Sequence, residues 1–375
     1  MKLAFTIFRY FPFGGLQLDF ARFLAEGIRR GHAVTVLYDR WEGEFIPGAE
    51  YVKLECRAWT NWGRALEFET RTRTYRQSHS FDKIVGFNRM GGLDFYYAAD
   101  NPFAGHARRK GLLVRMLIPR YRVFERLERS VFGASEHTVI LYLTEVQKAA
   151  FKSYYGTQEN RFRFLPPGVG RNFVLHEGDE ACRIRNQIRA EFNIPADAVL
   201  LLQVCSAYRT KGVDRVLEAL AQLSPELGGK VFYLIAGKEE PGEYRKQADR
   251  LGLSEQVIFA GPRHDVPYLL TAADLMVHPA RNEATGTVLA EAAVCALPVI
   301  CSGACGYAPL VKEAGGIVID EPFAVSALRD ALELSLRLPD GLKRLRRDAV
   351  QYARQTDFYH RTEDFWKFIE ETGHA

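Results

Sequence analysis

The sequence of 375 residues has no apolar run long enough to cross a membrane, which takes about 20 consecutive residues in a helix. Its apolar N-terminal stretch is short, because Arg9 and a turn with two glycines interrupt it before a signal-peptide core could form. Cysteine is scarce, and the six present show no disulfide framework; no further Cys or His pair completes a metal site with Cys301 and Cys305. We therefore expect a reduced, cytoplasmic protein that holds no metal and needs no cofactor.

The chain also lacks a strong excess of charge of either sign. Its net charge is +4, with 47% hydrophobic and 26% charged residues, which is typical of a soluble globular protein. The modest net charge and the lack of a recognition motif argue against nucleic acid as a partner. A chain of 375 residues is too long for one ordinary core, so we expect two domains.

Short apolar segments alternate with amphipathic segments of helical period along the whole chain. This alternation is typical of βαβ units and predicts an α/β fold with doubly wound parallel sheets. The predicted strands are residues 3–8, 33–38, 83–87 and 138–143 in the first half, and 199–205, 230–236, 256–259, 275–278, 299–301 and 316–319 in the second.

A segment rich in proline and glycine, residues 165–170, is typical of a hinge between domains. We predict a first domain of residues 1–168 and a second of residues 169–356, with residues 171–196 polar and irregular. A last amphipathic helix lies within residues 357–375.

The most informative segment places Glu283 and Glu291 on either side of a short Thr-Gly-Thr turn. It follows a predicted strand and opens an apolar helix that runs to Ala296. The free N–H groups of a helix N-terminus bind anions, and flanking carboxylates accept hydrogen bonds from sugar hydroxyls. A phosphate beside sugar hydroxyls indicates a nucleotide-sugar.

Three further loops follow predicted strands and carry candidate groups for an anion. Gly14 and Gly15 lie between the first strand and the first helix, where glycine lets the backbone approach a ligand, although a structural turn gives the same pattern. Arg209 and Lys211 suit a pyrophosphate, or form a solvated basic loop. Arg263 lies in a loop that could hold a base edge or be an ordinary connection.

The first half carries four polar candidates. Asn88 and Arg89 follow a predicted strand and could face a cleft. Asp100 ends an apolar run, as a cleft-facing carboxylate or a helix cap does. Asp19 lies one turn into the first helix, where we expect a solvated acid unless a cleft closes over it.

Residues 106–132 are strongly basic, with eight Lys or Arg against two Glu between 106 and 130. Leucine, methionine, isoleucine and aromatic residues interleave with the charges, which favours a basic amphipathic helix on an anionic membrane surface. A solvated basic face over a buried seam is the alternative. The candidate membrane residues are Arg108, Arg109, Lys110, Arg115, Arg120 and Arg122.

Several of these segments together resemble the retaining GT-B glycosyltransferases of family 4, and among them the lipopolysaccharide core glucosyltransferase I enzymes of Gram-negative bacteria. The resemblance covers nearly the whole chain. The segments that carry it are residues 10–17, 85–90, 165–168, 211–215 and 272–275, which runs on to the glutamate pair.

The resemblance implies two Rossmann-like domains facing a cleft, with the C-terminal helix crossing back to the first. The second domain would hold a UDP-sugar donor, and the first would hold the acceptor, an inner-core heptose of lipopolysaccharide. The enzyme would be peripheral, on the cytoplasmic face of the inner membrane, and independent of metal. The transferred sugar would keep its configuration by front-face attack, with a covalent carboxylate intermediate as the rival route.

The resemblance also implies roles for individual residues. Glu283 would contact the donor sugar and Glu291 the ribose, while Arg209 and Lys211 would neutralise the leaving UDP. Asp100 matches an acid assigned to catalysis in this family. The remaining donor-binding positions are Gly15, Arg263, Ala284, Thr285, Gly286, Thr287 and Val288, and the acceptor-side candidates are Asp19, Asn88 and Arg89.

The chain departs from the family pattern at two places. Thr210 stands where an arginine directly precedes the lysine, so that Arg209 is displaced by one position. Thr285 and Thr287 replace apolar residues beside the glycine, and one hydroxyl in a sugar pocket can change which sugar is accepted. The donor is therefore UDP-glucose or UDP-N-acetylgalactosamine. A transferase with another lipid-linked or soluble acceptor and a non-catalytic binding protein are the alternatives.

Overall fold

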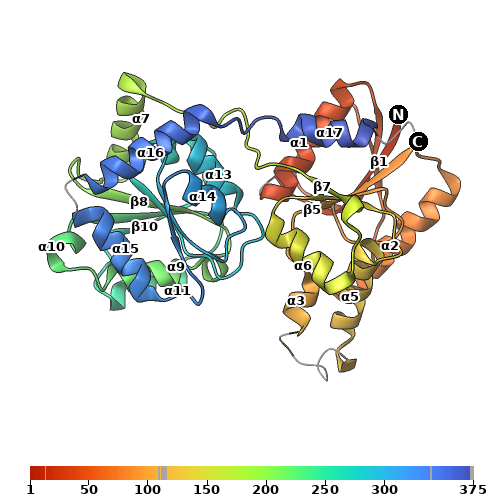
Figure 1. Ribbon diagram of the computed structural model, residues 1–375, viewed down its shortest axis with the longest axis horizontal. Helices are drawn as coiled ribbons and strands as arrows, with labels where there is room; N and C mark the ends of the chain where they lie inside the picture. The colour runs from red at the N-terminus through yellow and green to blue at the C-terminus, as the bar shows by residue number, and fades with distance from the viewer. Residues whose placement is uncertain (13, 109, 111–115, 338–339, 372–375) are drawn as a thin grey trace. The chain divides into compact units, whose positions relative to one another are not determined.

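The computed structural model describes residues 1–12, 14–108, 110, 116–337 and 340–371. It divides the chain into two compact units (Figure 1): the first contains residues 1–166 and the end of the chain from His360, and the second runs from Pro167 to Tyr359. Each unit is a parallel sheet covered by helices on both faces. The predicted class of two Rossmann-like α/β domains is confirmed.

The first unit is built on a parallel sheet with the strand order β3-β2-β1-β4-β5-β6-β7. Its strands are β1 (Lys2–Tyr10), β2 (Ala33–Trp41), β3 (Glu50–Lys53), β4 (Lys83–Gly86), β5 (Phe95–Ala98), β6 (Val139–Tyr142) and β7 (Phe162–Phe164). Its helices are α1 (Gly15–Arg29), α2 (Asn61–Ser78), α3 (Phe103–Arg108), α5 (Pro119–Phe132), α6 (Glu145–Tyr155) and α17 (Arg361–Glu371).

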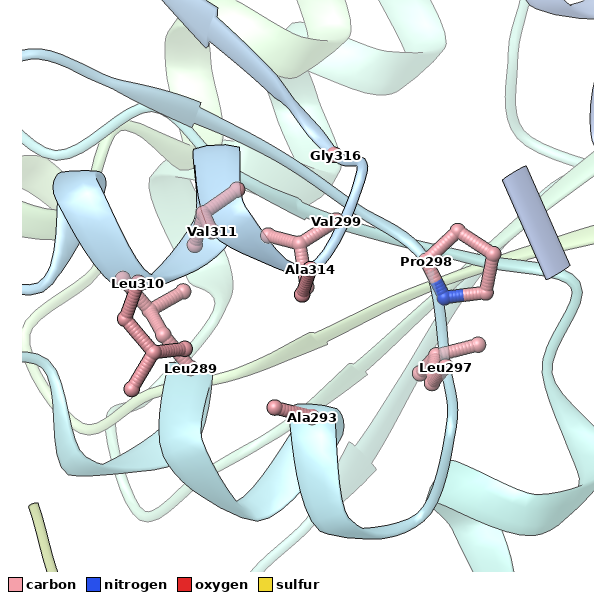
Figure 2. A pocket seen from close by; sticks show the side chains of 9 residues that line it. All are labelled: Leu289, Ala293, Leu297, Pro298, Val299, Leu310, Val311, Ala314 and Gly316. Carbon is pink, nitrogen blue, oxygen red and sulfur yellow. The ribbon is translucent and has the colours of Figure 1, made fainter. Parts of the chain in front are cut away.

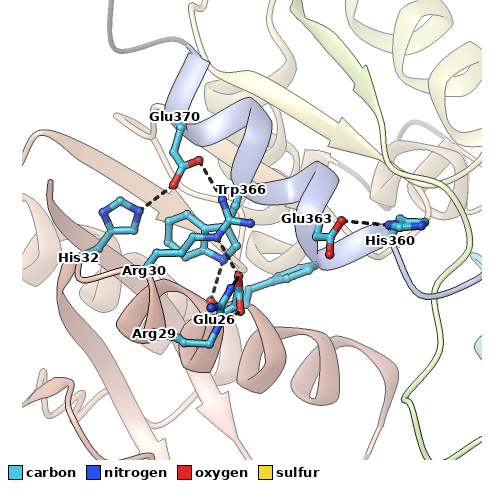
Figure 3. Close-up of polar contacts among 9 residues, drawn as sticks. Glu26, Arg29, Arg30, His32, His360, Glu363, Trp366 and Glu370 are labelled. Carbon is cyan, nitrogen blue, oxygen red and sulfur yellow. Dashed lines mark hydrogen bonds and ion pairs between the residues drawn. The ribbon is translucent and has the colours of Figure 1, made fainter.

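The last helix, α17, packs on α1 in the first unit, as the predicted return of the C-terminal helix requires. Trp366 is fully buried and lies so close to Gly27 that a Cβ there would be 2.2 Å from the indole ring. At the end of α17, Glu370 pairs with Arg30 at 2.9 Å and with His32 at 3.0 Å (Figure 3). Aromatic packing therefore holds α17 to α1, and ion pairs hold it to the residues that directly follow α1.

The second unit is built on a parallel sheet with the strand order β10-β9-β8-β11-β12-β13. Its strands are β8 (Val199–Val204), β9 (Val231–Ala236), β10 (Val257–Gly261), β11 (Leu275–His278), β12 (Val299–Ser302) and β13 (Ile317–Ile319). Its helices are α7 (Gly178–Glu191), α8 (Tyr208–Lys211), α9 (Val213–Leu220), α10 (Pro225–Gly228), α11 (Gly242–Arg250), α12 (Val266–Ala272), α13 (Thr287–Val294), α14 (Ala308–Glu313), α15 (Val325–Arg337) and α16 (Gly341–Gln355).

Two sequence-based expectations about helices are wrong. Residues 171–196, expected to be irregular, contain α7, whose Ile184 and Ile188 lie one turn apart and are buried in the core. The basic stretch 106–132 is not one helix: α3 ends at Arg108 and α5 begins at Pro119. Proline is favoured in the first turn of a helix and disfavours helical backbone in the residue before it. Within the described residues, no helix combines the length and the apolar character of a membrane span.

Candidate functional site

The polar side chains of the second unit gather where β8 and β11 end. These two strands are neighbours and run parallel, so their carboxyl ends meet at one edge of the sheet, where ligands of such sheets bind. The loop after β8 approaches the loop after β11 so closely that a Cβ on Gly212 would lie 2.2 Å from the Pro279 carbonyl oxygen. Gly212 also has a φ of +78°, so both the space and the backbone require glycine there.

Lys211, Glu283 and His278 form a polar cluster at this edge, in which His278 is buried and the other two are half-buried. The Lys211 ammonium donates to Oε2 of Glu283, and Nε2 of His278 lies 3.3 Å from the same oxygen. The backbone carbonyl of Lys211 accepts a hydrogen bond of 2.8 Å from the buried Gln203 side chain. The predicted partners Lys211 and Glu283, 72 residues apart in the chain, are thus in direct contact.

The electrostatics of the cluster keep Glu283 ionised. Burial alone would raise the pKa of Glu283, but the hydrogen bond from His278 and the charge of Lys211 outweigh it and lower that pKa to about 2. The carboxylate is therefore a hydrogen-bond acceptor throughout the physiological pH range.

The loop that carries Glu283 is fixed by backbone hydrogen bonds to the turn after β12. Glu283 N donates to the Ala304 carbonyl at 3.3 Å, and Tyr307 N donates to the Thr285 carbonyl at 2.8 Å. Gly286 ends the loop with a φ of +89° and directly precedes α13. Rigid backbone pairing positions the loop without help from a ligand.

Helix α13 presents its N-terminus at the same edge, and its buried face is firmly packed. Thr285 is 9% exposed and Glu291 is 8% exposed, whereas Ala284, Thr287 and Val288 are half-buried.

Figure 2 shows a small apolar cavity between α13 and α14, and no polar side chain lines it. Its lining residues are Leu289, Ala293, Leu297, Pro298, Val299, Leu310, Val311, Ala314 and Gly316.

Arg209 and Arg263, the two arginines of the second unit that were predicted to bind the donor, differ in their surroundings. Arg209 is exposed, and its carbonyl accepts a hydrogen bond of 2.7 Å from Arg281. Arg263 forms ion pairs of 2.6 Å with both Glu191 and Asp265, so its guanidinium already has two carboxylate partners. A ligand at Arg263 would have to compete with both.

Arg281 was not predicted as a site residue. Its guanidinium forms two hydrogen bonds of 2.7 Å to the Asp214 carboxylate and a third to the Arg209 carbonyl. Its backbone N–H donates to the Thr210 carbonyl at 2.8 Å. Arg281 therefore ties the loop of Glu283 to the loop of Lys211.

In the first unit, the expectation that Asp19 is a solvated helix acid is wrong. Asp19 is 2% exposed and accepts hydrogen bonds from the Tyr97 hydroxyl and, at 2.9 Å, from Arg361 of α17. Long-range partners explain its burial, since an ionised carboxylate is buried only when charge and hydrogen bonds compensate it. Gly15 begins α1 and is half-buried.

Arg89 lies next to the loop of Asp100, and both Arg89 and Asn88 have partners within the protein. Arg89 pairs with the fully buried Glu128 at 3.0 Å and donates to the carbonyls of Asp100 and Asn101 at 3.2 and 2.8 Å. The side-chain oxygen of Asn88 accepts from the backbone N–H of Phe8. The carboxylate of Asp100 itself is at the exposed surface.

The basic residues of the stretch 106–132 lie on the surface of the first unit. Arg108, Lys110, Arg120 and Arg122 are exposed, while Arg109 and Arg115 lie outside the described residues. Three apolar side chains between them, not predicted as site residues, are also exposed: Met116, Leu117 and Ile118, at 61%, 78% and 43%. We call these seven described residues the basic-apolar surface.

The fold and the comparisons define the class of protein. Residues 184–356 match the family described as glycosyl transferases group 1. Anabaena HepE, solved in complex with UDP and glucose, shares the fold with a TM-score of 0.75 at 19% identity, over the whole of both chains. Two Rossmann-like units with this match make the protein a glycosyltransferase of the GT-B class.

The particular family follows from a full-length relative. The chain is 38% identical over 365 residues to lipopolysaccharide glucosyltransferase WaaG of Escherichia coli K12, and the match covers 96% of each protein. A crystal structure of WaaG, described as a glycosyltransferase involved in lipopolysaccharide biosynthesis, has a TM-score of 0.92 at 36% identity, over 98% of this chain and 99% of that one. The chain belongs to the WaaG family of lipopolysaccharide glucosyltransferases, which confirms the predicted resemblance.

Proposed function

We propose that the protein moves a hexose from a UDP-sugar to an inner-core heptose of lipopolysaccharide, in the biosynthesis of the core oligosaccharide. The observation that carries the proposal is the contact between Lys211 and Glu283 beside the N-terminus of α13. Two elements of the family pattern meet there in one cluster. The family relationship to the Escherichia coli enzyme supports the acceptor class.

In this proposal the second unit binds the donor. The backbone N–H groups of Gly286, Thr287 and Val288 bind the diphosphate, and Glu291 binds the ribose. Lys211 neutralises the charge that develops on the leaving UDP, a role that a metal ion fills in other transferases. Arg209 is exposed on the same short helix, α8, and supplies a second cation.

Glu283 takes the donor sugar. Because its carboxylate stays ionised, it accepts hydrogen bonds from the hydroxyls and orients the ring above the diphosphate. In the first unit, we assign Asp100 to the acceptor hydroxyl and Gly15 to the diphosphate. The anomeric configuration is retained by front-face attack, in which a phosphate oxygen of the leaving UDP takes the acceptor proton.

Thr285 is the residue that we assign to donor choice between UDP-glucose and UDP-N-acetylgalactosamine. It lies beside Glu283 and is nearly buried, so its hydroxyl is a costly group unless a partner accompanies it. A sugar that forms a hydrogen bond with this hydroxyl binds more tightly than its epimer, which leaves the hydroxyl unpaired. The cost of the unpaired group, and so the difference in binding free energy, is about 1–3 kcal/mol.

The basic-apolar surface is assigned to the anionic cytoplasmic face of the inner membrane, where the acceptor is anchored. Exposed arginines and a lysine flank three exposed apolar side chains there. Each basic residue near such a surface contributes about 1 kcal/mol. Binding to vesicles of anionic lipid at low salt, lost at high salt or on neutral lipid, would support this assignment; equal binding to both lipids would overturn it.

A thermal-unfolding panel of UDP-sugars tests the donor directly. A ligand that binds only the native state stabilises it by about 2.7 kcal/mol at 100 times its Kd. The true donor should raise the Tm more than UDP alone does, because Glu283 adds contacts to the sugar. If no UDP-sugar exceeds UDP, the proposed function is wrong.

A further inference from the structure

His278 is a buried titratable residue that the proposed donor site does not use. It ends β11 and is 1% exposed, with Nε2 3.3 Å from Oε2 of Glu283. An ionised carboxylate only accepts hydrogen bonds, so Nε2 carries the hydrogen and donates it. The other ring nitrogen, Nδ1, is buried and has no hydrogen-bond partner among the described residues. The polar contact of the ring is therefore made to Glu283.

His278 and Lys211 donate to the same oxygen of Glu283. Both contacts are to Oε2, and within the described part of the chain no hydrogen bond reaches Oε1. Two donors, one at the end of β11 and one at the end of α8, fix the carboxylate in one orientation. The second oxygen is left to accept a hydrogen bond from a ligand.

We propose that His278 is a positioning residue for glycosyl transfer: together with Lys211 it holds Oε2 of Glu283 and directs Oε1 at a hydroxyl of the donor sugar. The inference rests on the proposed function for the identity of that ligand. In this arrangement the protein holds Oε2 of Glu283, and Oε1 is left for the sugar.

A structural role alone accounts poorly for a histidine here. A buried nitrogen without a partner costs about 1–3 kcal/mol, which an apolar side chain of similar size would avoid. The titratable groups that face Glu283 are Lys211, His278, and the thiols of Cys205 and Cys305. His278 donates a hydrogen bond to the carboxylate from a buried ring, while Lys211 brings its ammonium to the same oxygen.

Two amide substitutions separate positioning from packing. In His278→Gln the amide nitrogen stands close to the place of Nε2 and can donate to Glu283, whereas in His278→Asn it stands near the place of Nδ1 and cannot. Both variants bury one amide. Thr271→Val is the matched control, because it removes a buried hydrogen bond of α12, of 2.9 Å to the Pro267 carbonyl, away from the site.

The measurements are the affinities for UDP, UDP-glucose and UDP-N-acetylgalactosamine by calorimetry, and kcat and KM with a heptose-terminated lipopolysaccharide acceptor. We expect all variants to bind UDP within about twofold of the unaltered protein, since UDP does not need Oε1. The Asn variant should lose about 10- to 100-fold in kcat and in the extra affinity for the UDP-sugar over UDP, while the Gln variant stays within about threefold.

The pH profile gives a second readout that a packing defect would not move. Without the His278 donor, the pKa of Glu283 should rise from about 2 towards its ordinary value of 4.5, so the acid limb of kcat/KM should shift to higher pH in the Asn variant. The Gln variant should keep the profile of the unaltered protein.

Equal losses in the Gln and Asn variants, or unchanged kinetics in both, would overturn the inference. If the Asn variant does not fold, the Gln variant decides alone: a loss of the UDP-sugar increment with UDP binding intact refutes positioning, and its retention supports it. Unaltered protein that binds neither UDP-sugar more tightly than UDP contradicts the proposed function instead, and the inference falls with it. That failure is distinguishable because it appears without any substitution.

Discussion

The carboxylate of Glu128 connects α5 to the loop of Asp100, and its removal should weaken both stability and transfer. Glu128 is 0% exposed. Its Oε1 accepts from Phe103 N at 2.8 Å and pairs with Arg89 at 3.0 Å, and its Oε2 accepts from Ala104 N at 2.9 Å and from the Tyr155 hydroxyl. These contacts hold the start of α3.

The substitution Glu128→Gln keeps the shape of the side chain but removes its charge and one acceptor. The amide NH2 would face the Ala104 N–H, and the Arg89 guanidinium, 17% exposed, would lose its counter-charge. Removing one partner of a buried ion pair costs about 3–5 kcal/mol. Arg89 also donates to the Asp100 carbonyl, so the loop of the assigned catalytic acid should loosen.

The assay is urea unfolding of the full-length protein together with the transfer rate on vesicle-bound acceptor. Glu125→Gln is the matched control, because it removes the same charge from the same helix outside the fully buried positions of α5. We expect Glu128→Gln to destabilise by about 3–5 kcal/mol and to slow transfer, and the control to change stability by less than about 1 kcal/mol. A Glu128 variant as stable as the control would show that the buried ion pair with Arg89 does not stabilise the fold.

Three further predictions concern other buried groups. Because the pKa of Glu283 is lowered from 4.5 to about 2, its ionised form stabilises the fold by about 3 kcal/mol at any pH above 4.5, and this stabilisation is lost as the pH falls towards 2. The difference in unfolding free energy between the unaltered protein and Glu283→Gln should therefore shrink between pH 6 and pH 3. A difference that stays constant over this range would contradict the lowered pKa. Gly27→Ala should lower the free energy of unfolding by about 1–3 kcal/mol in chemical denaturation, because the new Cβ would lie 2.2 Å from Trp366. Gly228→Ala is the control and should not destabilise the protein, since no atom lies within 4 Å of its new Cβ. Equal effects of the two substitutions would count against the packing of Trp366 on Gly27. Asp19→Asn should lower the Tm through its buried ion pair to α17, by about 3–5 kcal/mol in free energy, and an unchanged Tm would argue against that pair.

Local sequence patterns predicted the elements that have local causes. Helix α6 has local causes at both ends, because Thr144 accepts a hydrogen bond from Gln147 N and Gly156 adopts a φ of +65° after the last turn. The strand 275–278 is also as predicted. Capping residues and apolar runs carry their information within a few positions.

Elements that depend on distant partners were missed. Strand β5 is short, and its assignment depends on pairing with β4 and β6 rather than on any local turn signal. Asp19 reads as a solvated acid because its partners Tyr97 and Arg361 are 78 and 342 residues away. No local pattern carries such a contact.

The candidate site shows the same division. Glu283, Lys211 and the start of α13 were predicted from motifs, each on its own loop. His278 was hidden, since it ends an apolar strand and reads as part of it; its contact with Glu283 appears only when the strand and the following loop are folded together. The prediction of one helix over the basic stretch 106–132 failed for the same reason, since α3 ends at Arg108 and α5 begins at Pro119.

The proposed function makes the Lys211–Glu283 cluster the donor site of a UDP-sugar transferase that acts on lipopolysaccharide. The most direct measurement is hexose transfer from UDP-glucose and from UDP-N-acetylgalactosamine to purified heptose-terminated lipopolysaccharide, for the unaltered protein, Lys211→Ala and Glu283→Ala. We predict transfer from one of the two donors, and its loss in both variants while their circular dichroism stays native. Full activity in both variants, or no transfer from either donor by the unaltered protein, would show that the proposed function is wrong.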